Sequence, residues 1–155
     1  MEFVFTNGND KRFTDLCDEL DDYLNEVVGG EKQREKYNQY NTLEDIHDVI
    51  LVIDDGQCVG CASFKKHDAV TAEIKRVFVK KEYRRNGYAK VIMQALEQRA
   101  IEAGYYKLIL ETGNSLKPAI VLYRNLGYEI IENYGEYEGM PESVCMAKPL
   151  RKIVQ

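Results

Sequence analysis

The hydrophobic pattern of the chain changes its period at Gly87. Before this glycine, three runs rich in β-forming residues follow one another, at residues 48–53, 57–64 and 70–79. After it, apolar residues recur at steps of three and four over residues 89–103, which predicts a helix that the next glycine ends. The chain must therefore build a sheet whose third run of this series leads directly into a helix.

The remaining elements complete a mixed α/β (α+β) order. Asp54-Asp55-Gly56 is a strong hairpin signal, so the three runs are expected to form consecutive antiparallel strands. The strand expected at residues 105–110 is reached through a helix and should run parallel to the strand before it. Further strands are expected at residues 3–5, 128–132 and 143–148, and further helices at residues 10–28, 31–40 and 116–126. The sequence predicts a mostly antiparallel sheet of six to seven strands flanked by about four helices.

Composition places this fold in a single domain. A chain of 155 residues is about one domain long and buries roughly 70% of the surface that it exposes when unfolded. We expect residues 1–155 to form one domain. The longest aliphatic run, residues 49–53, is far shorter than a membrane span, and the first ten residues lack the pattern of a signal peptide. A cytoplasmic protein that does not contact membrane is expected.

The cysteines and histidines do not form a metal-site pattern. Four cysteines are expected to be free thiols, because a domain of this size does not need disulfides. Cys58 and Cys61 have CxxC spacing, but they lie in an expected strand, where an offset of three should place them on opposite faces. His47 and His67 are the only histidines and stand twenty residues apart. We expect no metal.

The turn before the central helix has the features of an anion site. It reads Arg84-Arg85-Asn86-Gly87-Tyr88-Ala89. The first amides of a helix have no partner within it and lie at the positive end of its dipole, so they bind anions. Gly87 allows positive φ and a close ligand, small Ala89 leaves room, and the arginines supply charge-assisted donors. The turn is predicted to hold phosphate.

The surroundings of the turn are basic. Between residues 75 and 90 seven side chains are basic and one is acidic, a net +6 in a chain whose total is −5. Neither GxxxxGK[ST] nor GxGxxG is present here, which excludes a P-loop and a Rossmann loop. Two other interpretations stay open: a solvated basic helix start, and a nucleic-acid surface. The acidic total and the acidic first helix make the second one weak.

The pattern Arg84-x-x-Gly87-x-Ala89, between a strand and a helix, resembles the [RQ]xxGx[GA] signature of the GCN5-related N-acetyltransferase (GNAT) family. Other stretches are similar to that family in order and spacing, so that the resemblance covers residues 49–150. They are GCASF, EIKRVFV, LILETGNSLKPAIVLYRNLGYEII and YGEYEGMPESVCMAKPL. The LETG and AIxLYxxLGY motifs resemble one bacterial branch of small acetyltransferases.

The resemblance implies an enzyme that uses acetyl-CoA as cosubstrate and no metal. The loop of residues 84–89 is then expected to hold the pyrophosphate, and the backbone of Val77, Phe78 and Val79 to pair with the pantetheine arm as an added strand would. A splay between this strand and the next would admit the arm. Amides near Val79 could polarise the thioester oxygen.

Two departures from the family pattern concern the coenzyme contacts. The loop of relatives usually has a glycine just after the first arginine or its neighbour, and often a second glycine where Ala89 stands. Here Asn86 tolerates positive φ, so binding is expected to be kept. Leu116 stands where many relatives carry an asparagine that touches the coenzyme, so Asn114 or Lys117 is expected to take its place.

An amine must lose a proton before it attacks a thioester, and the departing thiolate must gain one. Glu73, eleven residues before Arg84, is the leading candidate for the base, and Glu111 is the reserve. The alternative for Glu73 is a strand-face glutamate paired with Lys75 or another neighbour. Tyr123 matches the family's general acid, although its helical face also fits a core tyrosine.

The resemblance implies direct transfer in a ternary complex to a primary amine of a small molecule or peptide. The acceptor pocket is expected to use residues 23–40 and 134–141, whose tyrosines and carboxylates suit a cationic amine. Two other functions stay open: a coenzyme A sensor without turnover, and nucleic-acid binding through residues 75–90, which we rank last. A homodimer through the late strands stays open as well.

Overall fold

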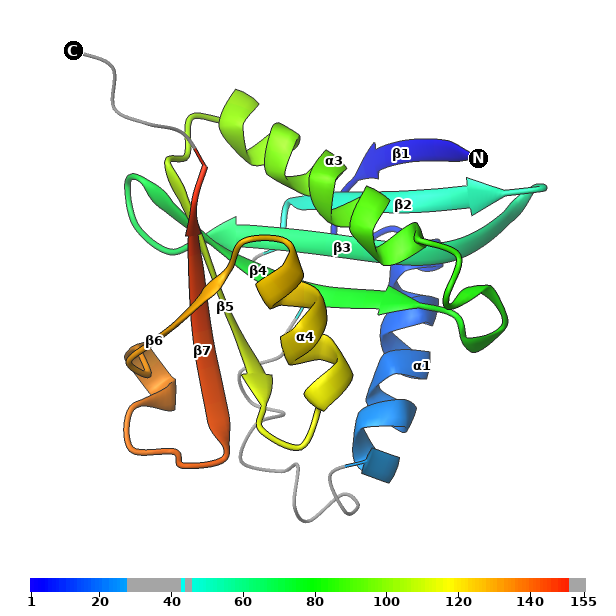
Figure 1. The fold of residues 1–155 in the computed structure, drawn as a ribbon. Helices are drawn as coiled ribbons and strands as arrows, with labels where there is room; N and C mark the ends of the chain where they lie inside the picture. Colours follow the sequence, from blue (N-terminus) through cyan, green and yellow to red (C-terminus); the bar gives the residue numbers. More distant parts are fainter. Residues whose placement is uncertain (28–42, 44–45, 151–155) are drawn as a thin grey trace.

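The computed structural model describes residues 1–27, 43 and 46–150 (Figure 1). Its strands are β1 (Glu2–Thr6), β2 (Asp48–Asp54), β3 (Gln57–Lys66), β4 (Thr71–Val79), β5 (Lys107–Gly113), β6 (Glu129–Ile131) and β7 (Ser143–Pro149). Its α-helices are α1 (Lys11–Val27), α3 (Tyr88–Glu102) and α4 (Lys117–Asn125). Two short 3-10 turns, η1 (Lys81–Tyr83) and η2 (Gly135–Tyr137), complete the elements of the described residues.

The strands form one sheet in the order β1-β2-β3-β4-β5-β7-β6. Within the described residues β4 and β5 are the one parallel pair, and the neighbouring strands otherwise pair antiparallel. The predicted mixed sheet, its hairpins and the parallel step after α3 are confirmed. The helix expected at residues 31–40 lies outside the described residues, so the described part has three α-helices.

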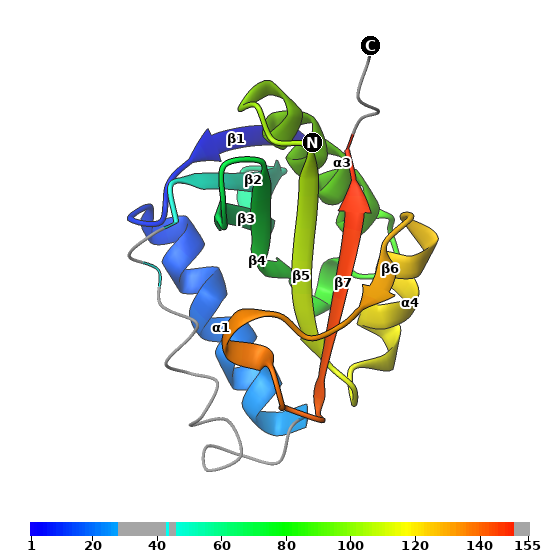
Figure 2. The ribbon, with the colours of Figure 1, turned by 90° about the vertical axis from the view of Figure 1, so that its left-hand side faces the viewer.

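Helices cover both faces of the sheet (Figures 1 and 2). Ile50 and Val52 of β2 join the cluster that α3 and α4 cover, and Val49 and Leu51 join the cluster that α1 covers. A strand buried on both faces reads as an unbroken apolar run, which is why β2 gave a clear signal in the sequence. On one face, α3 and α4 contribute Ile92, Met93, Leu96, Ala100 and Tyr123 to the cluster. On the other face, α1 contributes Phe13, Leu16, Cys17 and Leu20.

The expected placement of Cys58 and Cys61 on opposite faces is wrong. Val52 pairs with Gly60 and Ile53 with Cys58, so Val59 is an extra residue that shifts the alternation of β3. Both cysteines consequently pack against the α1 cluster. They are free thiols, and burial raises the pKa of each.

Two further differences concern the element limits and the membrane. β5 runs to Gly113, three residues beyond the predicted end, because Glu111, Thr112 and Gly113 continue the ladder with β7. The polar side chains of Glu111 and Thr112 and the glycine after them are not part of an apolar run, so the hydrophobic pattern did not predict this extension. No helix in the described part of the chain is long and apolar enough to cross a bilayer.

Gly60 is expected to be required for the packing of α3 on β3. A Cβ atom at this position would lie 2.9 Å from Ile92 Cδ1 and 3.1 Å from the carbonyl oxygen of Phe78. Overpacking of this kind costs about 1–3 kcal/mol, so Gly60→Ala should lower the free energy of unfolding in urea by that amount. Gly113→Ala is the control, because its Cβ would meet Leu116 at an ordinary 3.7 Å. Equal stabilities of the two variants would contradict this account.

Candidate active site

A cleft opens where β4 and β5 part. The two strands pair over three positions, from Thr71 with Lys107 to Glu73 with Ile109. Beyond this point β4 continues along β3 and β5 continues along β7. Figure 1 shows the two strands diverging, with α4 beside the gap. A cavity of about 570 Å³ fills the divergence, within the size range of small-molecule sites.

A β-bulge at Arg76 turns β4 away from β5. Cys61 pairs with Phe78 and Ser63 with Lys75, so Ala62 faces two residues of β4. Arg76 takes φ +57°, a conformation that costs a non-glycine residue of order 1–3 kcal/mol.

Side chains hold this bulge on both sides. The Cys61 thiol donates to the Arg76 carbonyl at 3.2 Å, and the Ser63 hydroxyl donates to the Lys75 carbonyl at 2.5 Å. The Arg76 guanidinium donates to Asp21 of α1 at 2.6 Å. The bulge is therefore fixed to both β3 and α1.

Beyond the bulge, β4 presents backbone groups to the cleft. The Lys80 amide donates to the Val59 carbonyl of β3 at 2.9 Å. Since successive residues of a strand point their N–H and C=O groups to alternate sides, those of Val77 and Val79 face the cleft. The backbone of Phe78 faces β3 instead, and its side chain lines the cavity. Of the three residues predicted to pair with the coenzyme arm, two thus present their backbone to the cleft.

The predicted anion loop begins α3 as expected. Gly87 is the N-cap residue with φ +78°, and a Cβ there would meet no atom within 4 Å. Besides Gly87, the loop residue with a positive φ is Arg85, at +67°. The sequence suggested Asn86 for a left-handed conformation, but Asn86 does not adopt one. Asn86 instead donates from Nδ2 to the Tyr83 carbonyl at 3.3 Å, which fixes the turn.

Arg84 turns inward and ties the loop to the cleft. Its Nε donates to the Val79 carbonyl at 2.9 Å, and its guanidinium lies over the rings of Tyr23, at 4.9 Å, and Phe78, at 5.4 Å. Arg84 and Ala89 line the cavity. Arg85, Asn86, Gly87 and Tyr88 lie outside its lining, and the Tyr88 hydroxyl donates to Asp54.

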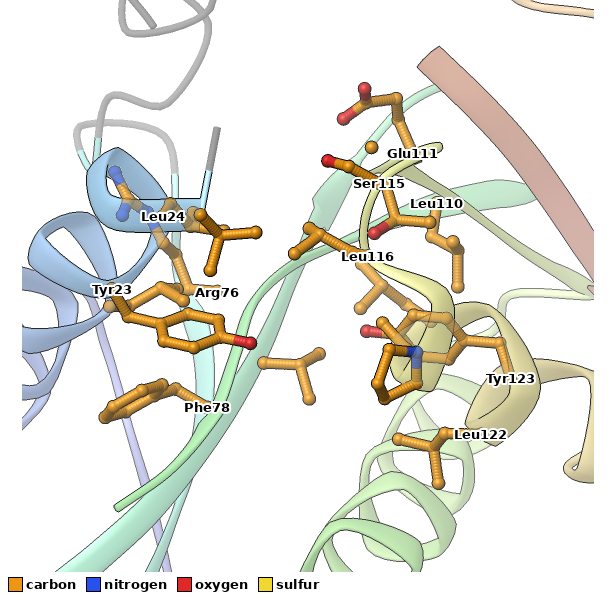
Figure 3. A pocket seen from close by; sticks show the side chains of 18 of the residues that line it. Tyr23, Leu24, Arg76, Phe78, Leu110, Glu111, Ser115, Leu116, Leu122 and Tyr123 are labelled. Atoms are coloured by element: carbon orange, nitrogen blue, oxygen red, sulfur yellow. The ribbon is translucent and has the colours of Figure 1, made fainter. Parts of the chain in front are cut away.

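Tyr123 of α4 stands across the cleft from α1. Its side chain is 8% exposed, and its hydroxyl points into the pocket (Figure 3). Burial raises the pKa of the phenol, so it stays protonated at neutral pH. Its ring packs edge-on against Tyr128, which keeps the side chain in place. The sequence left open whether Tyr123 is a core residue or a cavity residue. The structure shows that its ring packs in the core and that its hydroxyl reaches the cavity.

The two candidate bases differ in their access to the cavity. Glu73 is 3% exposed and lies outside the cavity lining; its Oε2 accepts from the Tyr134 hydroxyl at 2.7 Å and is 3.5 Å from Lys75 Nζ. Glu111 of β5 lines the cavity, as Figure 3 shows. The ion pair of Glu73 with Lys75, which the sequence offered as the alternative to a base role, is present.

Lys75 is a cavity residue that the sequence did not reveal. Its side chain is 9% exposed, it lines the cavity, and its Nζ donates to the Tyr137 hydroxyl at 3.0 Å. Burial lowers the pKa of this ammonium. The sequence named Lys75 as a member of a basic stretch and as a possible partner of Glu73 on the same strand face, but not as a residue of the cavity.

Asn114 and Lys117 were both expected near the coenzyme, and they differ in position. Asn114 lines the cavity, and its backbone N–H donates to the Glu142 backbone carbonyl at 2.8 Å. Lys117 is outside the cavity lining, and Leu116 itself contributes to the lining. Asn114 is thus the better placed of the two.

The splayed parallel pair, the glycine turn and the covering helices are those of the GNAT fold. Residues 13–128 match the acetyltransferase (GNAT) family. The chain therefore belongs to the GNAT family of acetyltransferases.

Two relatives and two solved structures illustrate the relationship. The N-acetyltransferase YsnE of Bacillus subtilis is 35% identical over 61% of this chain and 64% of its own length. The IAA acetyltransferase of Azospirillum brasilense is 31% identical over 87% of this chain and 88% of its own. A Klebsiella pneumoniae structure described as an acyl-CoA N-acyltransferase has a TM-score of 0.79 at 25% identity, covering 97% of both chains. A GNAT acetyltransferase of Elizabethkingia anophelis, solved with acetyl-CoA bound, has a TM-score of 0.68 at 19% identity, over 96% of this chain and 97% of its own, and shows the same fold.

Two glycine-to-glutamate variants test whether the loop before α3 binds acetyl-CoA. Gly87 and Gly56 have nearly the same φ, +78° and +77°, and open surroundings, so a glutamate costs similar backbone strain at both. Gly87→Glu adds a carboxylate at the helix start and should raise the Kd for acetyl-CoA about tenfold or more in calorimetric titration. Gly56→Glu, in the β2–β3 turn, should leave the Kd unchanged. An equal effect of both variants would place the ligand elsewhere.

Proposed function

We propose that this chain is an acetyl-CoA-dependent N-acetyltransferase that acts on a primary amine of a small molecule or peptide. The observation that carries the proposal is the cleft between β4 and β5, which has Arg84 and Ala89 from the turn that begins α3 at one end and a buried phenol in its wall. The relationship to the IAA acetyltransferase supports acetyl transfer as the chemistry. The acceptor of that relative is not carried over to this chain.

The residues of the cleft fit the coenzyme as an extended ligand. Val77 and the backbone amide of Val79 are on the side of β4 that β5 leaves unpaired, where an added strand would bond, while the Val79 carbonyl already accepts from Arg84. The amides that begin α3 and the guanidinium of Arg84 suit the pyrophosphate. Asn114 and Leu116 would complete the opposite wall.

Acetyl-CoA supplies an acyl group activated as a thioester. The acceptor nitrogen attacks the carbonyl carbon of the thioester and forms the new C–N bond. The C–S bond then breaks, and coenzyme A leaves as a thiolate. Acetyl-CoA and the acceptor are bound together in one ternary complex during this step. Tyr123, which burial keeps protonated, is placed in the cavity wall to give its proton to the leaving sulfur.

The acceptor must lose a proton, and we propose Glu111 as the group that receives it. A base has to reach the amine directly or through water, and Glu111 lines the cavity while Glu73 lies outside the lining and pairs with Lys75. Glu73 then acts as the counter-charge of Lys75. This assignment reverses the order of the two candidates that the sequence favoured, and the variants below decide between them.

Cytoplasmic location and a homodimer stay predictions of the sequence.

Tyr123→Phe should lower kcat about a hundredfold, because the leaving thiolate loses its proton donor. The Kd for acetyl-CoA should not change, since the ring stays in the wall. Tyr128→Phe is the control: its hydroxyl donates to Glu97 outside the cavity lining, so its loss should affect stability and not kcat. Thiol release and product mass measure the rate. An unchanged kcat in Tyr123→Phe would remove the acid role.

Glu111→Gln should lower kcat/KM at neutral pH about a hundredfold. The loss should shrink at higher pH, where more of the free amine is unprotonated in solution. Glu73→Gln should mainly destabilise the fold, because breaking a buried ion pair costs about 3–5 kcal/mol. A folded Glu73→Gln protein with the larger loss of kcat/KM would make Glu73 the base.

A further inference from the structure

Tyr23 of α1 presents a phenol to the cavity from the side opposite Tyr123. Tyr23 lines the cavity, is half-buried, and packs against the apolar cluster that α1 covers. Figure 3 shows its hydroxyl pointing into the gap from the α1 side, while the Tyr123 hydroxyl points into the gap from the α4 side. The two phenols therefore flank the same space from opposite walls.

The hydroxyl of Tyr23 is open to a ligand. No hydrogen bond joins it to any of the described residues. Other tyrosines use their hydroxyls within the protein, as Tyr128 does with Glu97 and Tyr134 with Glu73. A hydroxyl in a cavity is hydrated when the cavity is empty, and a ligand that displaces this water favours binding only if it replaces the hydrogen bond. The Tyr23 hydroxyl is therefore suited to a ligand that has a polar group at this point.

The ring of Tyr23 shows which part of the cavity this is. The Arg84 guanidinium lies 4.9 Å from the centre of the Tyr23 ring and 5.4 Å from that of Phe78, and Arg84 Nε donates to the Val79 carbonyl at 2.9 Å. Tyr23 thus stands beside the part of β4 that follows the bulge, where the coenzyme arm is proposed to pair with Val77 and Val79.

An arm bound in this way needs polar partners besides β4. A ligand that pairs as an added strand gives the neighbouring strand only the groups on one of its sides. Its other polar groups lose water in a cavity whose lining includes Leu24, Leu116 and Leu122, which costs free energy unless they find a new partner. A phenol can serve such a group because it both donates and accepts.

Resting on the proposed function, we infer that Tyr23 binds the coenzyme in two ways. Its hydroxyl forms a hydrogen bond with a polar group of the pantetheine arm. Its ring holds the Arg84 guanidinium by a cation–π contact in the position proposed for the pyrophosphate. The sequence placed Tyr23 at the start of a segment expected to serve the acceptor, and the inference moves this residue to the coenzyme.

The test separates the arm of the coenzyme from its head. Acetyl-CoA is compared with 3′-phospho-ADP, which is coenzyme A without the pantetheine arm. The Kd of each ligand is measured by NMR titration for the wild-type protein, Tyr23→Phe and Tyr23→Leu. Phenylalanine keeps the ring over Arg84 and removes only the hydroxyl, whereas leucine removes both.

Tyr23→Phe should raise the Kd of acetyl-CoA about two- to tenfold, the effect of losing one hydrogen bond, and should leave the Kd of 3′-phospho-ADP unchanged. Tyr23→Leu should also raise the Kd of 3′-phospho-ADP, about two- to fivefold, because Arg84 loses the ring beside it. This second loss should disappear when Arg84→Ala is already present, since no guanidinium is then left to hold.

Tyr106→Phe is the control, because Tyr106 is 44% exposed and lies outside the cavity lining. It should change neither Kd. Thermal melting checks that each variant is folded.

Three results would overturn the inference. The Kd of acetyl-CoA could be the same in the wild-type and Tyr23→Phe proteins, or Tyr23→Phe could weaken both ligands equally, which would mean that the hydroxyl does not act on the arm. The effect of Tyr23→Leu on 3′-phospho-ADP could also persist beside Arg84→Ala, which would reject the role of the ring. Absence of acetyl-CoA binding in the wild-type protein would instead reject the proposed function itself.

Discussion

The bulge at Arg76 is the constraint on which the cleft depends. With one extra residue facing β3, β4 bends away and cannot follow β5 beyond the pair of Glu73 and Ile109. The ion pair of Arg76 with Asp21 holds this bend from the side of α1. The same bend leaves the backbone groups of Val77 and Val79 facing the gap. A regular β4 would stay paired with β5, and the cleft proposed to hold the coenzyme and the acceptor would not exist.

The arrangement also explains how distant groups meet in one cavity. Arg84 lies over the ring of Tyr23 and donates to the Val79 carbonyl, so the loop, α1 and β4 form one wall of the cavity. Tyr123 lies on the other wall with Glu111, because β5 leads into α4 through a short turn. The residues proposed for anion binding and for the acid and base roles therefore lie on two walls, and the bulge keeps these walls apart. This division is typical of a site in which a cosubstrate lies along the gap and an acceptor enters at its end.

Much of the fold could be predicted because its signals are local. The apolar run of β2, the hairpin turn at Gly56 and the helical period after Gly87 each depend on a few neighbouring residues, and all are confirmed. The positive φ at Gly87 followed from glycine alone. The structure differed where one extra residue changes a period: the bulge at Val59 put Cys58 and Cys61 on one face, and no local pattern signals it. The access of Glu73 and Lys75 to the cavity depends on how far β4 and β5 stay paired. That distance is a property of the assembled sheet.

The most direct test of the account is amide hydrogen exchange of Val77 and Val79, followed by NMR with and without acetyl-CoA. If the coenzyme lies along β4 as an added strand, amides that face the cleft become protected when it binds, while those of β2, already paired on both sides, do not change. The account predicts slower exchange at Val77 and Val79 and at the first amides of α3. Unchanged exchange at both valines in a saturated complex would contradict it, because the gap between β4 and β5 would then not be the coenzyme site.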